Sequence, residues 1–258
     1  MTSDTTMDWI ITPTYNERNN IRVLVERIFA LYPAIHVLVV DDNSPDGTGA
    51  VVKDLQKKYP NLHLKQRARK LGLASAYLGA FEEVLRGHPD VRAVITMDAD
   101  LSHDPTAIAT MLTEITRHDL VVGSRYVPGG GIENWELWRR LLSLGGNWYT
   151  RLVTFVPIHD LTAGFVCYRA SLLRQYDFAT ITAAGYGYQM QMKITAYRMG
   201  ASITETPIVF RQRVEGESKI SHRIIYEGLV VPWRFSPIAS LWRRTSDSAS
   251  VGVNTTYL

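Results

Sequence analysis

Apolar runs and amphipathic segments alternate along the first half of the chain. Short apolar runs predict buried strands at 9–12, 36–40, 62–66, 93–97 and 119–123. Helical periodicity between these runs predicts a helix that begins near Asn19 and further helices at 47–58, 73–86 and 105–117. Strands that are separated by about ten to fifteen helical residues form βαβ units. The pattern therefore predicts an α/β fold with a mostly parallel central sheet.

Two of the predicted strands end in clustered carboxylates. The run LVVDDNSPDGTG (38–49) places Asp42 at the end of one strand, and ITMDAD (95–100) places Asp98 and Asp100 at the end of another. Open α/β sheets bind ligands at the carboxyl ends of their strands. Carboxylates at a buried strand end need a cation or a hydrogen-bond donor. We interpret the two runs as parts of one nucleoside-diphosphate site with a divalent metal.

Composition narrows the class of protein. A chain of 258 residues with 46% apolar residues can form one large core, or a core with a small appendage. A net charge of only +3 argues against a general nucleic-acid-binding protein. The single cysteine, Cys167, excludes an intramolecular disulfide and suits a reducing compartment. We expect no signal peptide, because the N-terminus is polar, and no membrane span, because no apolar run reaches about 18 residues.

Eight sequence blocks occur in an order that matches a known family. They are PTYNERNNI (13–21), DDNSPDGT (41–48), LGLASA (71–76), MDADLSHDP (97–105), VGSRYVPGGG (122–131), DLTAGF (160–165), GYGYQMQM (185–192) and RVEGESK (213–219). Together they closely resemble the polyprenol-phosphate mannosyltransferases, the dolichol-phosphate mannose synthase family. The resemblance covers approximately residues 8–235. These proteins are family 2 glycosyltransferases with a Rossmann-like GT-A fold, so the resemblance implies that fold here.

The resemblance also implies an activity. Such an enzyme is an inverting glycosyltransferase that moves mannose from GDP-mannose to a polyprenyl or dolichyl monophosphate, and its product is a lipid-linked mannose donor for glycosylation. The variant DDNSPDGT, in place of the DDGSTDGT that is more usual in glucosyl relatives, favours mannose and guanine. A phosphate monoester has a second pKa of about 6, so the attacking oxygen is already anionic at neutral pH and needs no dedicated base.

The resemblance further assigns roles to single residues. The donor-binding positions of the family correspond to Pro13, Tyr15, Glu17, Val40, Asp42, Asp98, Ala99, Asp100, Ser102, Arg125, Arg213 and Lys219. Its metal-binding positions, for Mg²⁺ or Mn²⁺, correspond to Asp98, Asp100 and Ser102. Its catalytic positions, which include the basic residues that hold the phosphates, correspond to Asp100, Arg125, Arg139, Arg213 and Lys219.

Two positions depart from the family pattern. Archaeal relatives carry a glutamine two residues after the second aspartate, where this chain has Ser102, and a hydroxyl is a poorer metal ligand. Relatives carry an acidic residue at the position of Gln191. An amide keeps the shape of a carboxylate but cannot accept a proton. If that carboxylate orients the sugar or the acceptor, activity here is reduced and Gln191→Glu raises it.

Residues 137–156 have an amphipathic pattern that suits a membrane surface. One face of the helical wheel carries Trp138, Leu141, Leu142, Gly145, Tyr149, Leu152, Val153 and Val156, and the opposite face carries Arg140, Asn147 and Arg151. The pattern predicts an interfacial, acceptor-binding helix with Arg139 at its border. Periodicity alone equally allows a helix packed on the sheet. A second apolar stretch, 224–244, is interrupted by prolines and is too short to span a bilayer.

These patterns together predict how the chain is organised. We expect a catalytic domain at 1–222, an amphipathic membrane-associated segment at 223–244 and a disordered tail at 245–258. The resemblance implies GDP-mannose, a polyprenyl or dolichyl phosphate and a membrane surface as partners, with no nucleic acid, and it makes a membrane-anchoring subunit a candidate partner. It also implies peripheral attachment to the cytoplasmic face of a membrane, which is the plasma membrane in a bacterium and the endoplasmic reticulum in a eukaryote.

Three alternative functions differ from this one in features that can be looked for in the sequence or in the site. A polyprenyl-phosphate glucosyltransferase that uses UDP-glucose would differ in the pocket for the base. A processive polysaccharide synthase would carry a QxxRW motif and transmembrane helices, and the sequence shows neither. A non-catalytic nucleotide-binding regulator requires that Ser102 and Gln191 have disabled the site.

Overall fold

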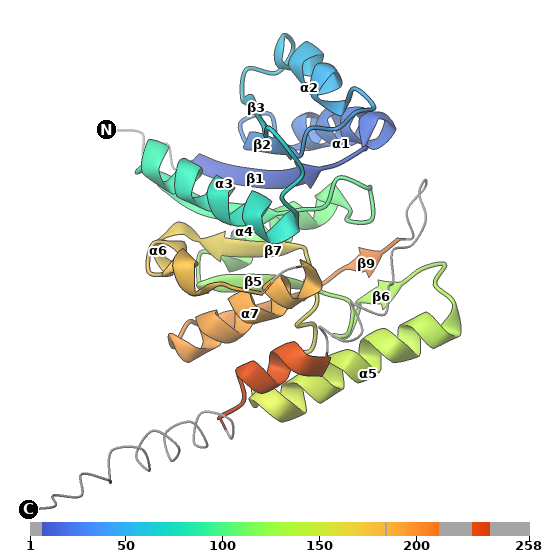
Figure 1. The fold of residues 1–258 in the computed structure, drawn as a ribbon, viewed down its shortest axis with the longest axis vertical. Helices are drawn as coiled ribbons and strands as arrows, with labels where there is room; N and C mark the ends of the chain where they lie inside the picture. Colours follow the sequence, from blue (N-terminus) through green and yellow to red (C-terminus); the bar gives the residue numbers. More distant parts are fainter. Residues whose placement is uncertain (1–6, 184, 212–228, 238–258) are drawn as a thin grey trace, which may run out of the picture.

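A central sheet organises the chain, which the computed structural model describes at residues 7–183, 185–211 and 229–237. Its strands are β1 (Met7–Thr14), β2 (His36–Asp41), β3 (Leu62–Gln66), β4 (Val91–Thr96), β5 (Leu120–Ser124), β7 (Val166–Arg169) and β8 (Ile203–Pro207). They lie in the order β3-β2-β1-β4-β7-β5-β8 (Figure 1). Neighbouring strands are parallel except at β7, which runs antiparallel to β4 and β5. The mostly parallel sheet predicted from the sequence is confirmed.

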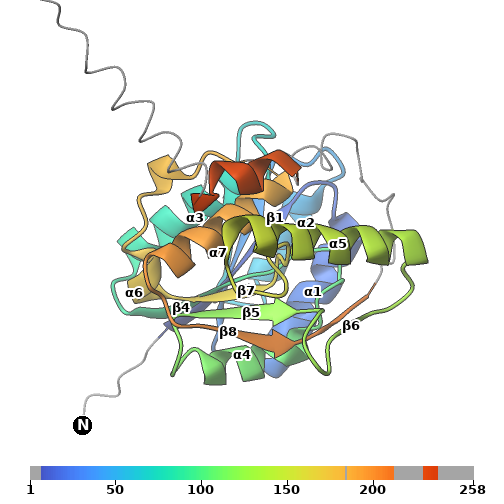
Figure 2. The same ribbon diagram turned by 90° about the horizontal axis from the view of Figure 1, so that it is seen from below.

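Helices connect the strands and cover both faces of the sheet. They are α1 (Arg18–Leu31), α2 (Thr48–Gln56), α3 (Leu73–Gly87), α4 (Ile108–Glu114), α5 (Leu137–Thr154), α6 (Ala170–Leu173) and α7 (Gly185–Arg198). Residues 229–234 are also helical. Figure 2 shows α3, α5 and α7 on one side of the sheet and α4 on the other.

The central strands send alternate side chains into two separate cores. In β1, Ile11 packs into the core that α3 and α7 cover, whereas Ile10 packs into the core that α1, α2 and α4 cover. Val40 and Val39 of β2 divide in the same way. All four side chains are buried. Burial on both faces explains why these strands appear in the sequence as continuous apolar runs.

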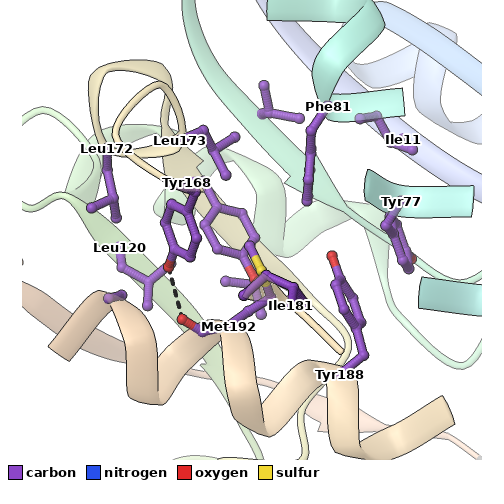
Figure 3. Close-up of a cluster of buried hydrophobic side chains, with 14 of the residues drawn as sticks. Ile11, Tyr77, Phe81, Leu120, Tyr168, Leu172, Leu173, Ile181, Tyr188 and Met192 are labelled. Carbon is purple, nitrogen blue, oxygen red and sulfur yellow. Dashed lines mark hydrogen bonds between the residues drawn. The ribbon is translucent and has the colours of Figure 1, made fainter. Parts of the chain in front are cut away.

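Aromatic side chains fill the core beneath α3 and α7. Tyr77 of α3 faces Tyr188 of α7, with 5.8 Å between the ring centroids (Figure 3). Phe81 packs edge-on against Tyr168 of β7. The contact between Tyr77 and Tyr188 joins α3 to the first half of α7, the helix that also carries Gln189 and Gln191.

The helix predicted at 105–117 begins differently from the prediction. Residues Pro105–Ala107 form a 3₁₀ turn, and α4 starts at Ile108. The carboxylate of Asp104 caps the turn by accepting a hydrogen bond of 3.1 Å from the Thr106 amide, and proline is well tolerated at such a first position. The sequence pattern also left β7, β8 and α7 unpredicted.

A small second sheet lies beside the carboxyl edge of the main one. It pairs β6 (Gly131–Ile132) with β9 (Val209–Phe210) in parallel. The amide of Gly130 donates to the carbonyl of Val127, and a Cβ at Gly130 would lie 2.6 Å from the carbonyl oxygen of Ser124. Only glycine fits this tight turn, which explains one glycine of the VGSRYVPGGG block.

Candidate active site

The two acidic runs meet at the carboxyl edge of the sheet. Strand β1 pairs with β2 on one side and with β4 on the other. The run that ends β2 and the run that ends β4 are therefore separated by a single strand. As predicted, Asp42 and the Asp98–Asp100 turn lie at the same edge, where open α/β sheets bind ligands.

Hydrogen bonds from backbone amides of the loop after β1 to side chains that follow β2 join the two segments. The amide of Glu17 donates to Thr48 Oγ1, and the amide of Arg18 donates to Asp46 Oδ2, both at 3.0 Å. Partial burial would raise the pKa of Asp46, but hydrogen bonds from Thr48 and from the Arg18 amide outweigh burial and lower that pKa. The loop that carries Tyr15 and Glu17 is thus held in place by the DDNSPDGT block.

Asp42 is buried and already has several partners. Its Oδ2 atom accepts hydrogen bonds from the amides of Leu71 and Gly72, at 3.2 and 3.0 Å. Its Oδ1 atom lies 2.7 Å from Nη1 of Arg67 in a buried ion pair. Gly72 has φ +90°, which favours glycine. The carboxylate therefore also positions the LGLASA loop, and the sequence analysis missed its partner Arg67 because the pair is distant in sequence.

Tyr15 is half-buried at the same edge. The ammonium of Lys70 lies 3.6 Å from the centroid of its ring, a cation–π contact. The ring face is therefore turned toward the loop after β3, so Tyr15 does not belong to the sheet core. Of the other donor-site candidates, Pro13 and Glu17 are half-buried, whereas Val40 and Ala99 are buried.

The Asp98–Asp100 turn is held by its own neighbours. Leu101 has φ +64°, and this turn brings the Ser102 amide and hydroxyl to Asp100 Oδ1, at 3.1 and 2.6 Å. The amide of Asp98 donates to Nδ1 of His103 at 3.2 Å. Asp100 is buried and Asp98 is half-buried. The carboxylates thus point from a rigid turn, and Ser102 orients Asp100.

The acidic turn fits a divalent metal if further ligands are supplied. Mg²⁺ is commonly held by one or two carboxylates together with phosphate oxygens and water. Within the described residues, no group of three or more His, Cys, Asp and Glu side chains is arranged to hold a metal ion. Asp98 and Asp100 therefore provide only part of a coordination shell, and a diphosphate would have to provide more of it.

Arg125 is fixed by a buried carboxylate. Its Nε and Nη2 atoms each donate to the carboxylate of Asp160 at 2.7 Å, and Nη2 also donates to Thr162 Oγ1 at 2.8 Å. Burial would raise the pKa of Asp160, but the charge and hydrogen bonds of Arg125 outweigh burial and lower that pKa. The bidentate pair fixes the guanidinium against the DLTAGF block. Sequence reasoning identified Arg125 and missed Asp160.

An aromatic ring brings Arg125 and Arg139 together. The guanidinium carbon of Arg125 lies 5.8 Å from the ring centroid of Trp135, and that of Arg139 lies 5.1 Å from it. Trp135 also packs edge-on against Phe210 of β9. The two arginines predicted to hold phosphates are therefore close to the same side chain, whose role the sequence analysis missed.

A pocket lies between the acidic turn and α7. It is lined by Leu73, Asp98, His103, Arg125, Trp135, Thr162, Ala163, Gly164, Gln189, Ile208 and Phe210. Residues of the acidic turn, the VGSRY block, the DLTAGF block and the GYGYQMQM block thus share one cavity. A Cβ at Gly164 would lie 3.4 Å from Asp98 Oδ2, so this wall closely approaches the carboxylate.

A buried lysine stabilises one wall of this pocket. The ammonium of Lys193 donates to the carbonyls of Leu161, Ala163 and Gln189 at 3.1, 2.6 and 3.2 Å. Burial lowers the pKa of Lys193 to about 7, although the nearby Asp160 opposes this shift. The bonds to Leu161 and Ala163 join α7 to the loop that carries Asp160 and Thr162, and the bond to Gln189 stays within α7.

Gln191 has a structural role that differs from the one expected. Its Oε1 atom accepts hydrogen bonds from the amides of Thr182 and Ala183, at 3.1 and 2.9 Å, and its Nε2 atom donates to the carbonyl of Thr180 at 2.8 Å. The side chain does not line the pocket. An amide can make all three bonds, whereas an ionised carboxylate could accept from the two N–H groups but could not donate to the carbonyl. Gln191 therefore fixes the loop before α7 and is not placed to orient a substrate.

Helix α5 turns its polar side to the protein and its apolar side to solvent. Asn147, Thr150 and Thr154 are buried, and Thr162 bonds Asn147 through its amide and its hydroxyl, at 3.2 and 3.1 Å. The exposed large apolar side chains are Leu137, Trp138, Leu141, Leu142, Leu144, Trp148 and Leu152. This orientation rules out a helix that packs on the sheet through its apolar face.

The exposed apolar surface continues onto the helical residues 229–234. Leu229 and Trp233 are exposed, and the hydroxyl of Tyr149 donates to the carbonyl of Leu229 at 2.9 Å. Figure 1 shows the two helices side by side at one end of the molecule. One expectation needs correction: α5 ends at Thr154, and Val156 lies beyond it and is buried. We call Leu229, Trp233 and the exposed apolar residues of α5 the apolar patch.

Two predicted site residues, Arg213 and Lys219, lie outside the described residues, as do the tail at 245–258 and most of the segment at 223–244. In the ranges that the structure does describe, no helix combines a bilayer-spanning length with the apolar composition that spanning requires.

Known proteins resemble this chain in sequence and in fold. The model of the family "Glycosyl transferase family 2" matches residues 9–177. A polyprenol monophosphomannose synthase of Mycolicibacterium smegmatis is 42% identical, over 87% of this chain and 85% of the relative. An undecaprenyl-phosphate mannosyltransferase of Micrococcus luteus is 40% identical, over 90% of this chain and 94% of the relative.

Solved structures share the fold at low sequence identity. A glucosyl-3-phosphoglycerate synthase from Mycobacterium tuberculosis, in complex with Mn²⁺, UDP and glucosyl-3-phosphoglycerate, gives a TM-score of 0.65 at 15% identity, over 94% of this chain and 81% of that one. A mannosyltransferase from Pyrobaculum calidifontis, in complex with GDP-Man and Mn²⁺, gives a TM-score of 0.53 at 17% identity, over 96% of this chain and 82% of that one. The expected GT-A fold is confirmed, and the chain belongs to glycosyl transferase family 2.

Proposed function

We propose that this chain transfers mannose from GDP-mannose to a polyprenyl monophosphate, with inversion at the anomeric carbon. The observation that carries the proposal is the likeness, at 42% and 40% identity over most of the chain, to two proteins named as polyprenyl-phosphate mannosyltransferases. The site supports it with a carboxylate turn, fixed arginines and a pocket between them. The reaction would be a single displacement by the acceptor's phosphate oxygen.

The nucleoside would bind at the ends of β1 and β2. Tyr15 offers a ring face, now covered by the exposed Lys70, on which a base can stack. Pro13 and Glu17 form the half-buried rim, and buried Val40 forms the floor. Asp42 contributes mainly by holding the LGLASA loop, because its oxygens are already engaged.

Asp98, Ala99 and Asp100 would receive the diphosphate, and the two carboxylates would hold Mg²⁺ or Mn²⁺. When bound, the metal would neutralise negative charge on the departing GDP. Ser102 acts on Asp100 by hydrogen bonding, so we assign it the orientation of that carboxylate. Arg125 would face the donor from the pocket wall. Arg213 and Lys219, which lie outside the described residues, are assigned to phosphate binding by resemblance.

The acceptor would reach the site from a membrane surface. We propose that the apolar patch enters the interface between lipid headgroups and acyl chains, where burial of apolar area contributes about 25 cal/mol per Å². Arg139 lies near the start of α5 beside Trp135, where it can bind the acceptor's phosphate. The attachment to the membrane would be peripheral and on the cytoplasmic face. The chain would consist of one catalytic domain at 1–222 followed by the membrane-associated segment at 223–244.

Donor comparison tests this proposal. The purified chain should turn over GDP-mannose with a short polyprenyl phosphate and Mn²⁺ or Mg²⁺, and it should prefer GDP-mannose to UDP-glucose. Equal or faster turnover of UDP-glucose would indicate a glucosyltransferase. Tight GDP-mannose binding in calorimetry without any turnover would indicate a nucleotide-binding regulator.

A further inference from the structure

One buried side-chain amide on the pocket wall has no hydrogen-bond partner among the described residues. Gln189 of α7 is only 2% exposed. Neither its Oε1 atom nor its Nε2 atom has a hydrogen-bond partner among the described residues. Buried polar groups are nearly always hydrogen-bonded, because an unmade bond leaves the cost of desolvation uncompensated. An exception on the wall of a pocket indicates a site for a ligand.

Gln191 and Lys193 of the same helix do have partners, whereas the hydroxyl of Tyr188, which packs in the aromatic core away from the pocket, has none among the described residues. Gln191 has the same side chain two residues later, and it makes three hydrogen bonds to the backbone of 180–183. Lys193 donates three hydrogen bonds, one of them to the carbonyl of Gln189 itself. The backbone at Gln189 is therefore fixed while its side chain lines the pocket without a partner.

The position of the pocket identifies the part of the donor that it would receive. In the sheet order, β1 and β2 lie on one side of β4, whereas β7 and β5 lie on the other. The loops proposed for the nucleoside follow β1 and β2, the acidic turn follows β4, and the pocket wall with Arg125 and Gly164 comes from the ends of β5 and β7. A nucleotide sugar bound across this edge places its base, its diphosphate and its sugar in that order.

The chemistry of an amide also favours a sugar. Phosphate oxygens only accept hydrogen bonds at neutral pH and would leave Oε1 unpaired, whereas a metal ion would leave Nε2 unpaired. Neighbouring hydroxyl groups supply both a donor and an acceptor. We propose that Gln189 binds the sugar ring of the donor, with Nε2 donating to one hydroxyl oxygen and Oε1 accepting from another. Gln189 is thus a specificity-determining residue for the sugar, and this inference rests on the proposed function.

The pair Gln189→Leu and Gln191→Leu tests this assignment. Gln189→Leu removes a buried amide that has no protein partner, so the variant should melt at the same temperature as the wild type or higher. Its affinity for GDP with Mn²⁺ should be unchanged. The additional affinity for GDP-mannose over GDP should be lost, and kcat/KM for GDP-mannose should fall about 10- to 100-fold, as expected for the loss of two hydrogen bonds.

The matched variant should give the opposite pattern. Gln191→Leu breaks three hydrogen bonds to the backbone, so the melting temperature of this variant should fall. The folded variant should still bind GDP-mannose more tightly than GDP, by the same factor as the wild type. Deoxymannose analogues of the donor sharpen the test: removal of the contacted hydroxyls should weaken binding to the wild type and have little further effect in Gln189→Leu.

Each contrary result has a separate meaning. An unchanged kcat/KM in Gln189→Leu, or a loss of melting temperature as large as in Gln191→Leu, would overturn the inference and leave the proposed function standing. A wild type that binds GDP-mannose no better than GDP and does not turn it over would overturn the proposed function and the inference with it.

Discussion

Asp98 and Asp100 are two residues apart, yet their surroundings differ. Asp100 is buried and accepts two hydrogen bonds from Ser102, whereas Asp98 is half-buried and lines the pocket. The hydrogen bonds from Ser102 fix the orientation of the Asp100 carboxylate before an ion binds, which suits a metal ligand.

We therefore predict that Asp100→Ala removes most of the metal dependence of GDP binding. Calorimetric titration of GDP in Mn²⁺ and in EDTA should show a large difference for the wild type and a small one for the variant. Asp104→Ala is the matched control, because Asp104 caps the neighbouring 3₁₀ turn and should not change that difference. Equal GDP affinities in EDTA and Mn²⁺ for the wild type would contradict the metal assignment.

The contacts of Gln191 reverse the expectation drawn from its sequence position. A carboxylate there can still accept from Thr182 and Ala183 but cannot donate to the Thr180 carbonyl when it is ionised. We predict that Gln191→Glu lowers stability by about 1–3 kcal/mol, which is about 2–12 °C in melting temperature. Turnover per folded molecule should not rise.

An exposed glutamine provides the control for this change. Gln175→Glu alters the same functional group, where the amide donates only to the Ser171 carbonyl, and should shift the melting temperature by much less. A clear rise in kcat for Gln191→Glu would instead support the family-based expectation and a role near the substrate.

The roles of some site residues could be predicted from the sequence, and the roles of others could not. The acidic turn could be predicted because its chemistry is local and strand ends share one edge. Arg67 and Asp160 could not, because each acts through a partner that is distant in sequence. Gln189 and Gln191 are two positions apart and project from α7 in opposite directions. Which of them faces the pocket depends on how α7 docks, and the sequence does not specify that docking.

At the scale of elements, histidines gather where the amino ends of β1 to β3 meet. Trp9 stacks on His36 and His63, with ring centroids 4.8 and 5.0 Å apart, and makes a tilted contact with His88 at 4.6 Å. Nδ1 of His36 lies 3.2 Å from Nε2 of His63. Burial lowers the pKa of both His36 and His63, and the charges of neighbouring histidines lower it further.

These shifts predict acid sensitivity. Because the folded-state pKa values lie below the unfolded value of about 6.5, the unfolded state binds more protons as the pH falls. The stabilisation is present above pH 6.5 and is lost as the pH falls below it. The melting temperature should therefore drop between pH 7.5 and 5.5, and it should drop less in the double variant His36→Gln/His63→Gln. Equal drops would show that other groups cause the acid sensitivity.

Helix α5 carries the prediction about the membrane. Trp138 and Leu142 are exposed, so Trp138→Asp/Leu142→Asp should leave the fold and GDP affinity intact. Binding to vesicles with anionic lipid should be lost, since both the apolar burial and part of the attraction of Arg140 and Arg151 are removed. Co-sedimentation with vesicles measures this.

A control for this variant lies on α1, outside the apolar patch. Val23 and Leu31 are exposed apolar residues, so Val23→Asp/Leu31→Asp makes the same chemical change elsewhere. This control should bind vesicles like the wild type. If neither the wild type nor the control binds vesicles, attachment requires a membrane-anchoring subunit, and the proposed direct attachment is wrong.

Some helices and strands could be predicted from the hydrophobic pattern of the sequence, and others could not. The βαβ half could be predicted, because strands buried on both faces leave continuous apolar runs. Antiparallel β7 could not, because it is inserted between β4 and β5 from a distant part of the sequence. Periodicity showed that α5 has a polar and an apolar face but not which face packs on the protein. That choice depends on which face meets the DLTAGF loop.

At the scale of the whole molecule, the nucleotide edge and the apolar patch belong to one structure. Asn147 joins α5 to Thr162, which also contacts Arg125. The helix that would rest on a membrane is thus bonded to the wall of the pocket that would hold the donor sugar. This arrangement suits a reaction between a water-borne donor and a lipid acceptor.

The structure of the product tests this account most directly. The chain should be incubated with GDP-α-mannose, a short polyprenyl phosphate and Mn²⁺, and the lipid extract should be analysed by mass spectrometry and by NMR of the anomeric carbon. We predict a polyprenyl phosphate that carries one mannose in the β configuration, and no such product when the acceptor is omitted. A product with the α configuration would contradict single displacement, and release of free mannose without a lipid product would contradict the lipid acceptor.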